Sequence, residues 1–93
     1  MIRSFRDRET ERIFDRLGSA RLPPDIHPAA LKKLLILDAA ASLQDLTVPP
    51  GNRLERLSGD RRTQYSIRVN DQWRVCFRWE EGDAFDVEIA DYH

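Results

Sequence analysis

The sequence predicts an α+β fold in which two N-terminal helices pack on a three- to four-stranded antiparallel sheet. Three observations lead to this prediction. Apolar residues in the first half recur at helical spacing, the spacing changes from helical to alternating after Gly51, and three alternating segments then follow with short polar connections. Helices that precede a run of adjacent strands favour two layers, with the helices covering one face of the sheet.

The first 20 residues predict a short strand and a short helix. Residues 1–5 are compatible with a strand, since Ile2 and Phe5 are apolar. Residues 7–17 are predicted to be helical because Ile13, Phe14 and Leu17 recur at helical spacing among charged residues. Gly18 then supplies a typical C-terminal stop for a helix.

The main helix is expected over residues 28–46. Pro28 suits the first position of a helix, where the missing N–H would lack a partner in any case. Strong helix formers follow and form a wide apolar face. They include Leu31, Leu34, Leu35, Leu37, Leu43 and Leu46, and the alanines at 39–41. The segment "TVPPGN" ends the helix because proline cannot continue it.

The second half predicts an antiparallel meander. "RLERL" is a short extended piece, and "SGDRR" is a polar turn. Three alternating strands follow in "QYSIRV", "WRVCFRW" and "AFDVEIA", joined by "NDQ" and "EEGD". The residues expected on the core face are Tyr65, Ile67, Val69, Trp73, Val75, Phe77, Trp79, Phe85, Val87 and Ile89.

The opposite face of this sheet is rich in charge. It is expected to carry Ser66, Arg68, Arg74, Cys76, Arg78, Asp86 and Glu88. If "NDQ" is a three-residue loop, Arg68 lies opposite Arg74; if "EEG" is another, Trp79 pairs with Asp83 and Arg74 lies opposite Glu88. Two readings follow: a ladder of surface ion pairs that each contribute little, or two arginines held together to receive an anion such as phosphate.

Composition points to one small domain, residues 1–93, with an uneven charge distribution. The net charge is −1, but residues 53–78 carry seven arginines against three acids, whereas residues 79–93 carry six acids and no lysine or arginine. The single cysteine, Cys76, excludes an internal disulfide and is expected to be structural, and no metal-ligand spacing is present. Without a signal peptide or an apolar span, we expect a soluble cytoplasmic protein that needs no cofactor and no metal.

The last three residues, "DYH", suggest a reaction that an arginine-rich face would favour. Cleavage of RNA through its 2′-OH needs a base, an acid and positive charge for the phosphorane, which histidine and arginine supply. Tyr92 can donate a proton or stack on a base, and Asp91 can orient the imidazole of His93. Strict alternation places Asp91 and His93 on the helix side with Ile89, so the chain must bend to bring them to Arg74.

Taken together, these residues resemble the HigB-type toxins, the plasmid-maintenance "killer protein" branch of the RelE/ParE superfamily. The resemblance spans all 93 residues. It comprises "MIRSF", the "LLILDAA" helix, leucines before a Gly-Asp-Arg turn, a Ser-Ile-x-Val strand, an Asn-x-x-Trp-Arg hairpin entry and the terminal Asp-Tyr-His. It implies a compact RelE-like (microbial RNase-like) fold and a ribosome-dependent, metal-independent endoribonuclease that cleaves translated mRNA.

The resemblance also implies partners. They are a cognate HigA-like antitoxin with a helix-turn-helix domain, the A site of the 30S ribosomal subunit with its mRNA, and operator DNA through the antitoxin only.

By resemblance, Asp91, Tyr92 and His93 match the terminal catalytic group, and Arg74 in "WRV" matches the transition-state arginine. Glu55 stands where the family can carry a histidine, within "LHPL", so it is either a general base or the mark of a slower enzyme. The residues expected to contact RNA are Arg56, Arg61, Arg62, Arg68 and Arg78.

Two alternatives remain open at this level. The chain is then either a weak or catalytically lapsed toxin that acts mainly as a co-repressor with its antitoxin, or a ParE-like inhibitor of gyrase. Glu55 in place of histidine motivates the first alternative, whereas the terminal Asp-Tyr-His and the arginine face argue against the second.

Overall fold

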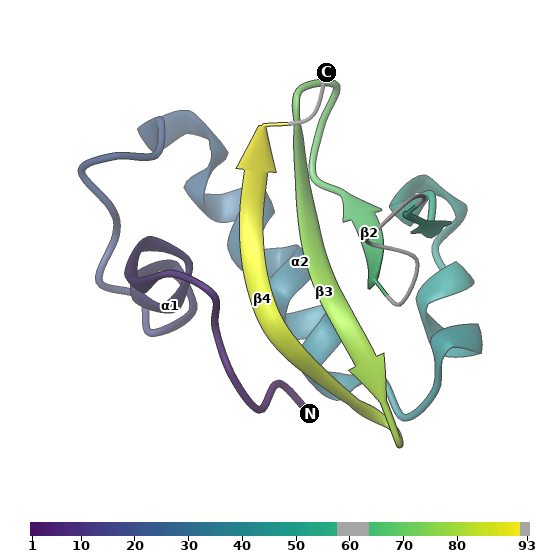
Figure 1. Ribbon diagram of the computed structural model, residues 1–93. Helices are drawn as coiled ribbons and strands as arrows, with labels where there is room; N and C mark the ends of the chain where they lie inside the picture. The colour runs from purple at the N-terminus through teal and green to yellow at the C-terminus, as the bar shows by residue number, and fades with distance from the viewer. Residues whose placement is uncertain (58–63, 92–93) are drawn as a thin grey trace.

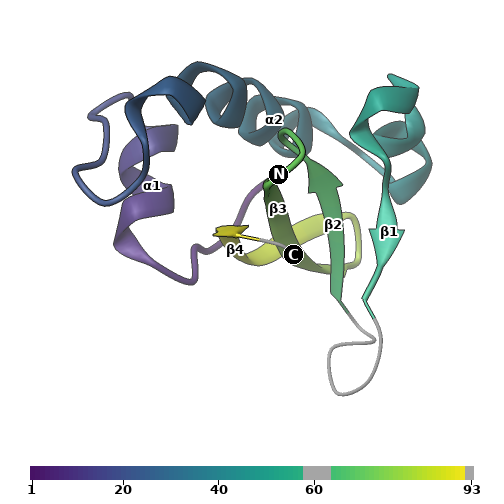
Figure 2. The ribbon, with the colours of Figure 1, turned by 90° about the horizontal axis from the view of Figure 1, so that it is seen from above.

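The computed structural model describes residues 1–57 and 64–91. Their helices and strands form two layers, in which α2 crosses one face of an antiparallel sheet (Figures 1 and 2). The elements are α1 (Arg8–Phe14), η1 (Pro24–Ile26), α2 (His27–Ala39), η2 (Leu43–Thr47), η3 (Pro50–Asn52), β1 (Glu55–Arg56), β2 (Gln64–Arg68), β3 (Trp73–Glu80) and β4 (Asp83–Asp91). The predicted α+β class is confirmed.

Helix α1 begins and ends close to the predicted residues. Asp7 caps it, since its carboxylate accepts a hydrogen bond from the Thr10 amide at 2.7 Å. The helix ends at Phe14 rather than Leu17, because Arg16 adopts a left-handed conformation with φ of 64°.

The predicted helix over residues 28–46 was wrong in its C-terminal third. Helix α2 ends at Ala39, and Ala40 is extended. A separate turn, η2, then begins with a capping box in which Ser42 and Asp45 exchange side-chain and backbone hydrogen bonds. The serine and the acid three residues later were visible in the sequence, but the continuous run of helix formers concealed them.

The sheet has the order β1-β2-β3-β4, with every neighbouring pair antiparallel. The predicted β2–β3 hairpin is confirmed: Arg68 lies opposite Arg74, and the Val69 amide donates to the Trp73 carbonyl at 2.9 Å. The "RLERL" segment contributes the short strand β1, in which Glu55 pairs with Ser66.

The predicted β3–β4 register was wrong. The connection is a two-residue turn in which Glu81 and Gly82 both have positive φ, so Glu80 rather than Trp79 pairs with Asp83. The register then shifts again at a β-bulge between Cys76 and Arg78.

On β4 this bulge coincides with Asp86, which has a φ of 53°. Arg74 consequently lies opposite Ala90, and Glu88 lies opposite Cys76. Alternation had placed Phe85 on the core face. The bulge moves it to the other face, where Phe85 pairs with Arg78.

The N-terminal segment lies along the outer edge of β4 (Figure 1). The strand predicted for residues 1–5 is reduced to two isolated parallel bridges, Ile2 with Ala84 and Phe5 with Val87. The Arg3 and Arg6 amides donate to the Ala84 and Val87 carbonyls at 2.8 and 2.9 Å.

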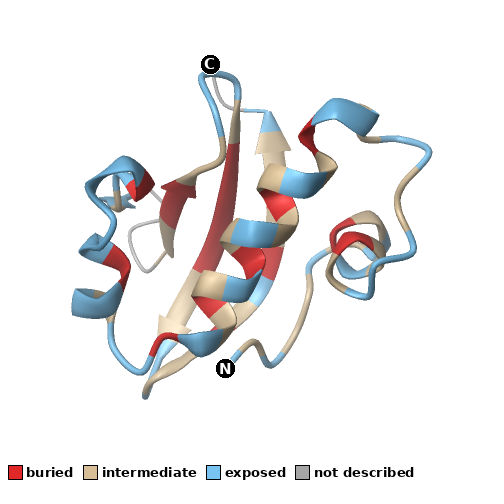
Figure 3. Ribbon diagram, turned by 180° about the vertical axis from the view of Figure 1, so that it is seen from behind, coloured by how far each residue is buried: buried red, intermediate tan, exposed pale blue. Residues whose placement is uncertain are grey.

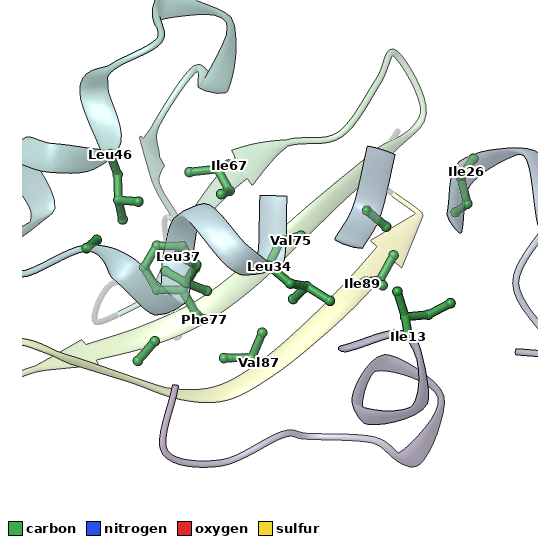
Figure 4. Close-up of a cluster of buried hydrophobic side chains, with 13 residues drawn as sticks. Ile13, Ile26, Leu34, Leu37, Leu46, Ile67, Val75, Phe77, Val87 and Ile89 are labelled. Carbon is green, nitrogen blue, oxygen red and sulfur yellow. The ribbon is translucent and has the colours of Figure 1, made fainter. Parts of the chain in front are cut away.

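The core lies between α2 and the face of the sheet that α2 covers (Figures 3 and 4). The largest wholly buried apolar side chains are Phe77, Leu34, Leu37, Leu46, Ile67, Val75 and Val87. At the edge of this core, the buried Thr10 hydroxyl accepts a hydrogen bond from the Ile89 amide at 2.9 Å and thereby joins α1 to β4. Within the described parts of the chain, no helix combines the length and the apolar character that crossing a membrane requires.

Candidate active site on the open face of the sheet

The face of the sheet turned away from α2 presents two rows of paired residues. The strand registers place Glu55, Ser66, Cys76 and Glu88 in one row, and Arg68, Arg74 and Ala90 in the next. Among the elements that the structure describes, no helix lies over this face (Figures 1 and 2). This face is polar and carries no helix among the described residues, but the side chains at its centre, Ser66, Cys76 and Arg74, are buried.

Arg74 is the central side chain of this face and is only 7% exposed. Its Nε donates to the Ser66 hydroxyl oxygen at 2.7 Å, and its Nη2 donates to the Ser66 carbonyl at 3.3 Å. Nη2 also donates to the carbonyl of Arg53, which the left-handed backbone at that residue (φ 44°) turns toward it. Three acceptors among the described residues thus hold the guanidinium in one orientation.

Glu55 and Arg74 are brought together by the β1–β2–β3 pairing. Glu55 Oε2 lies 3.9 Å from Arg74 Nη2. The two side chains differ in exposure, since 54% of the Glu55 side chain is accessible and only 9% of that of Arg74. A fixed buried cation beside an accessible carboxylate suits a site where charge is stabilised and a proton moves.

Arg68 lies opposite Arg74 as predicted but has its own acceptors. It forms an ion pair with Asp71, and its Nε donates to the Asn70 carbonyl at 3.2 Å. Separate acceptors for the two guanidiniums reduce the repulsion that like charges in direct cross-strand register create. A shared anion site between them stays a prediction.

Lys33 is a cation on α2, the helix that covers the other face of the sheet, and sequence analysis did not single it out. Partial burial, and then the positive charges of Lys32 and Arg68, hold the pKa of its ammonium below the usual value. Its Nζ donates to Oδ1 of Asn52, a wholly buried side chain that also donates to the Leu46 carbonyl. Nothing in the helical pattern distinguishes Lys33 from its neighbour, so only the fold reveals its position.

Two further predicted RNA contacts lie away from this centre. Arg78 pairs with Glu80 and, at 3.5 Å, with Asp86, and its guanidinium carbon lies 4.7 Å from the centroid of the Phe85 ring. Arg56 is exposed on β1, next to Glu55 in the sequence and therefore on the other face of that strand.

The predicted pairing of Glu88 with Arg74 was wrong. Because the β3–β4 register differs from the expected one, Glu88 lies opposite Cys76, and its Oε1 is 3.6 Å from Arg6 Nη1. Cys76 is buried, as expected for a structural thiol.

The predicted terminal catalytic group is only partly described. Asp91 pairs with Trp73, one position beyond Arg74, and its Oδ2 accepts a hydrogen bond from Gln72 Nε2 at 3.0 Å. Tyr92, His93, Arg61 and Arg62 lie outside the described residues. Across residues 1–57 and 64–91, no group of three His, Cys, Asp or Glu side chains is placed to hold a metal ion.

Sequence reasoning missed the residues that hold Arg74 in place. Ser66 was assigned to the polar face without a role, and the carbonyl of Arg53 carries no signal in the sequence because any residue supplies one. The available clue was Ser66, a polar residue on the strand next to β3 and on the same face as Arg74. A buried arginine needs acceptors, and the neighbouring strand can supply them.

The two-layer fold, with helices on one face of an antiparallel sheet, is consistent with the class of RelE-like toxins. The family model described as "RelE-like toxin of type II toxin-antitoxin system HigB" matches residues 3–93. The chain is 42% identical over 90 residues to Toxin HigB-1 of Vibrio cholerae serotype O1, covering 96% of this chain and 95% of that protein. It is 29% identical to Endoribonuclease HigB of Proteus vulgaris over the full length of both chains.

The chain therefore belongs to the HigB family of toxins of type II toxin–antitoxin systems. An uncharacterized protein of Haemophilus influenzae is also similar, at 33% identity over 70 residues. As a member of a type II system, the toxin has an antitoxin as its partner.

Proposed function

We propose that this toxin is a ribosome-dependent endoribonuclease that cleaves translated mRNA and thereby inhibits translation. The single observation that carries the proposal is the fixed Arg74 guanidinium with the Glu55 carboxylate 3.9 Å away on an open polar face. The similarity to a relative named Endoribonuclease HigB supports the same chemistry.

The proposed reaction is transesterification within the RNA strand. A base removes the proton from a 2′-OH, the 2′ oxygen attacks the adjacent phosphorus, and the bond to the 5′ oxygen breaks as an acid protonates that oxygen. The products are a 2′,3′-cyclic phosphate and a 5′-OH end. The RNA supplies the nucleophile and side chains supply the proton transfers, so the proposal invokes no metal and no cofactor.

Each residue has a proposed role in this scheme. Arg74 stabilises the charge that develops on the phosphorane. His93 and Glu55 exchange the two protons, while Asp91 orients the imidazole and Tyr92 positions or stacks on a base. The residues proposed to contact the phosphates of mRNA or ribosomal RNA are Arg56, Arg61, Arg62, Arg68 and Arg78.

The proposed setting is the cytoplasm, at the A site of the 30S subunit. A HigA-like helix-turn-helix antitoxin is the proposed inhibitor, and operator DNA is reached only through that antitoxin. The net charge of −1 is compatible with RNA binding, because the arginines of residues 53–78 supply a local basic segment.

The test compares the parent toxin with His93→Ala, Arg74→Ala and Arg74→Lys on mRNA bound to translating ribosomes. Arg74→Lys keeps the charge but loses the planar fork, so it separates geometry from charge. We expect each variant to lose cleavage by at least about 100-fold, the typical effect of removing one preorganised donor. Parent-like cleavage by both His93→Ala and Arg74→Lys would exclude the proposed active site.

Substrate dependence is tested with the same protein on free mRNA. The parent should leave free mRNA nearly intact while it cleaves mRNA on ribosomes. Equal rates on both substrates would contradict ribosome dependence.

The lapsed-toxin alternative keeps one specific observation in its favour. Glu55 pairs with Arg74, and this ion pair explains the carboxylate as a structural partner without any catalytic role. Expression without antitoxin decides between the two functions: growth arrest supports the nuclease, and normal growth with intact mRNA supports a co-repressor module.

A further inference from the structure

Helix α2 is apolar on two opposite faces. One face buries Ala30, Leu34 and Leu37 against the sheet. The other face carries Leu31, Leu35, Ile36 and Ala39 at one-turn and two-turn spacing, around an open hollow of about 490 Å³. Leu35 is 39% exposed, and Figure 3 shows this outer side of α2 turned toward the viewer. A surface helix normally has a single apolar face, so the second one is typical of a helix that is covered by a partner.

The apolar surface continues from α2 toward α1. A second hollow of about 350 Å³ is lined by Ile13, Arg16, Gly18 and His27, and it shares Pro28 and Leu31 with the first. The two hollows thus form one continuous surface, which we call the α2 groove. With α2 roughly 20 Å long at about 1.5 Å per residue, the groove has the length of a three- to four-turn helix.

The charged residues that line the α2 groove have one sign. Lys32 lines the first hollow and Arg16 lines the second, and neither lining includes an aspartate or a glutamate. The occupant of the groove is therefore expected to be apolar where it meets the leucines and acidic at its margins.

Charge also argues against a second copy of this chain as the occupant. In a two-fold symmetric dimer the same patch lies on both subunits, so a surface lined by Lys32 and Arg16 would meet a surface that carries the same two cations and no acid in its lining. Close like charges across an interface are unfavourable. The partner must therefore differ from the toxin, and membership of a type II system supplies one, the antitoxin.

We propose that the α2 groove is the docking site of the antitoxin, and that it receives an amphipathic helix flanked by acidic side chains. Leu31 and Leu35 form the apolar centre of this site. Lys32 and Arg16 attract the acidic side chains along the edges of the antitoxin helix. The binding mode is that of a helix in a groove, in which a few apolar side chains carry most of the affinity. The site lies on the opposite layer from Arg74, and the inference does not depend on RNA cleavage.

The experiment measures, by isothermal titration calorimetry, the affinity of the purified toxin for its purified antitoxin. Leu35→Glu and Leu35→Ala probe the apolar centre, and Lys32→Glu probes the margin. Val48→Glu is the matched control, because Val48 is 69% exposed and lines neither hollow. Circular dichroism and thermal unfolding confirm that each variant folds.

We expect Leu35→Glu to weaken binding by at least about 30-fold, the loss typical of a central contact, and Leu35→Ala to weaken it less. Lys32→Glu should weaken binding and reduce its dependence on salt. Val48→Glu should bind as the parent does. Cleavage of ribosome-bound mRNA by free Leu35→Glu should match the parent, which separates this inference from the proposed nuclease function.

Three outcomes would overturn the assignment. Unchanged affinity of both Leu35→Glu and Lys32→Glu places the antitoxin elsewhere. An equal loss for Val48→Glu shows that any added acid weakens the complex. A free toxin that sediments as a dimer, with Leu35→Glu dissolving the dimer but not the antitoxin complex, assigns the groove to a second copy.

Discussion

The Nε of Arg74 donates a hydrogen bond to the Ser66 hydroxyl across the β2–β3 pair, over a distance of 2.7 Å. Ser66 is wholly buried and Arg74 nearly so. A buried charge is costly unless its donors find acceptors, so this bond both stabilises the two strands and orients the guanidinium. The residue that we propose stabilises the phosphorane is therefore positioned by a neighbouring strand.

Ser66→Ala is expected to lower both stability and activity. Losing a buried hydrogen bond to a charged group should reduce the free energy of unfolding by about 1.5–3 kcal/mol. The cleavage rate under single-turnover conditions should fall because the guanidinium is no longer held in one orientation. Urea unfolding and single-turnover cleavage on ribosomes measure the two effects.

A double-mutant cycle with Arg74→Ala is the control for this interpretation. Ser66→Ala should cost clearly less stability in the Arg74→Ala background, because the shared bond is already absent. Additive losses would show that Ser66 acts independently of Arg74. Arg78→Ala, which removes a more exposed ion pair, should cost about 1 kcal/mol or less.

Glu55→Gln separates a catalytic carboxylate from a structural one. The substitution keeps the shape and removes the charge, and the side chain is largely exposed, so we expect a stability loss of about 1 kcal/mol or less. If Glu55 transfers a proton, cleavage should fall by about 100-fold or more. An unchanged rate would remove Glu55 from the mechanism and leave it as a partner of Arg74.

Thr10→Val tests the connection between α1 and β4. Valine has nearly the same shape but no hydroxyl, so the buried Ile89 amide loses its acceptor at a cost of about 1–3 kcal/mol. Hydrogen exchange at the Ile89 amide should accelerate in Thr10→Val and stay slow in Thr10→Ser. Slow exchange in both variants would mean that another group satisfies this amide.

The ion pairs of Asp83 predict that the stability of the fold depends on pH at low pH. Desolvation raises the pKa of this carboxyl, but hydrogen bonds from Arg3, at 3.1 Å, and from the N-terminal ammonium, at 3.3 Å, outweigh it and lower the pKa overall. Because the pKa of Asp83 is lowered in the folded state, its ion pairs stabilise the fold fully above the unfolded pKa of about 3.9. This stabilisation is lost as the pH falls through the folded pKa.

Asp83→Asn should therefore unfold at a lower temperature than the parent near neutral pH, and the difference should narrow as the pH falls below about 4. Thermal unfolding across this range checks the expectation. Asp83→Asn should lower the unfolding temperature less in an Arg3→Gln background, because Arg3→Gln already removes one of the two partners of Asp83. Parallel curves for the parent and Asp83→Asn would refute the role of these ion pairs.

The local sequence pattern was sufficient to predict the register of the β2–β3 hairpin. The alternation in β2 and β3, with the three-residue "NDQ" connection, predicted that Arg68 lies opposite Arg74, because a hairpin register follows from its loop length. The same argument failed at "EEGD", since both two-residue and three-residue loops are compatible with those letters. Only the φ values of Glu81 and Gly82 distinguish them.

The sequence by itself determined the α+β class, the alternating core positions of β2 and β3, and the family of the chain. These depend on periodicity and on motifs that act over a few residues. The tertiary structure alone decided which face of α2 is buried, the bulge at Asp86 that moved Phe85 and Glu88, and the acceptors that hold Arg74. Those features arise from contacts between strands and segments far apart in the chain, whose energies no local pattern encodes.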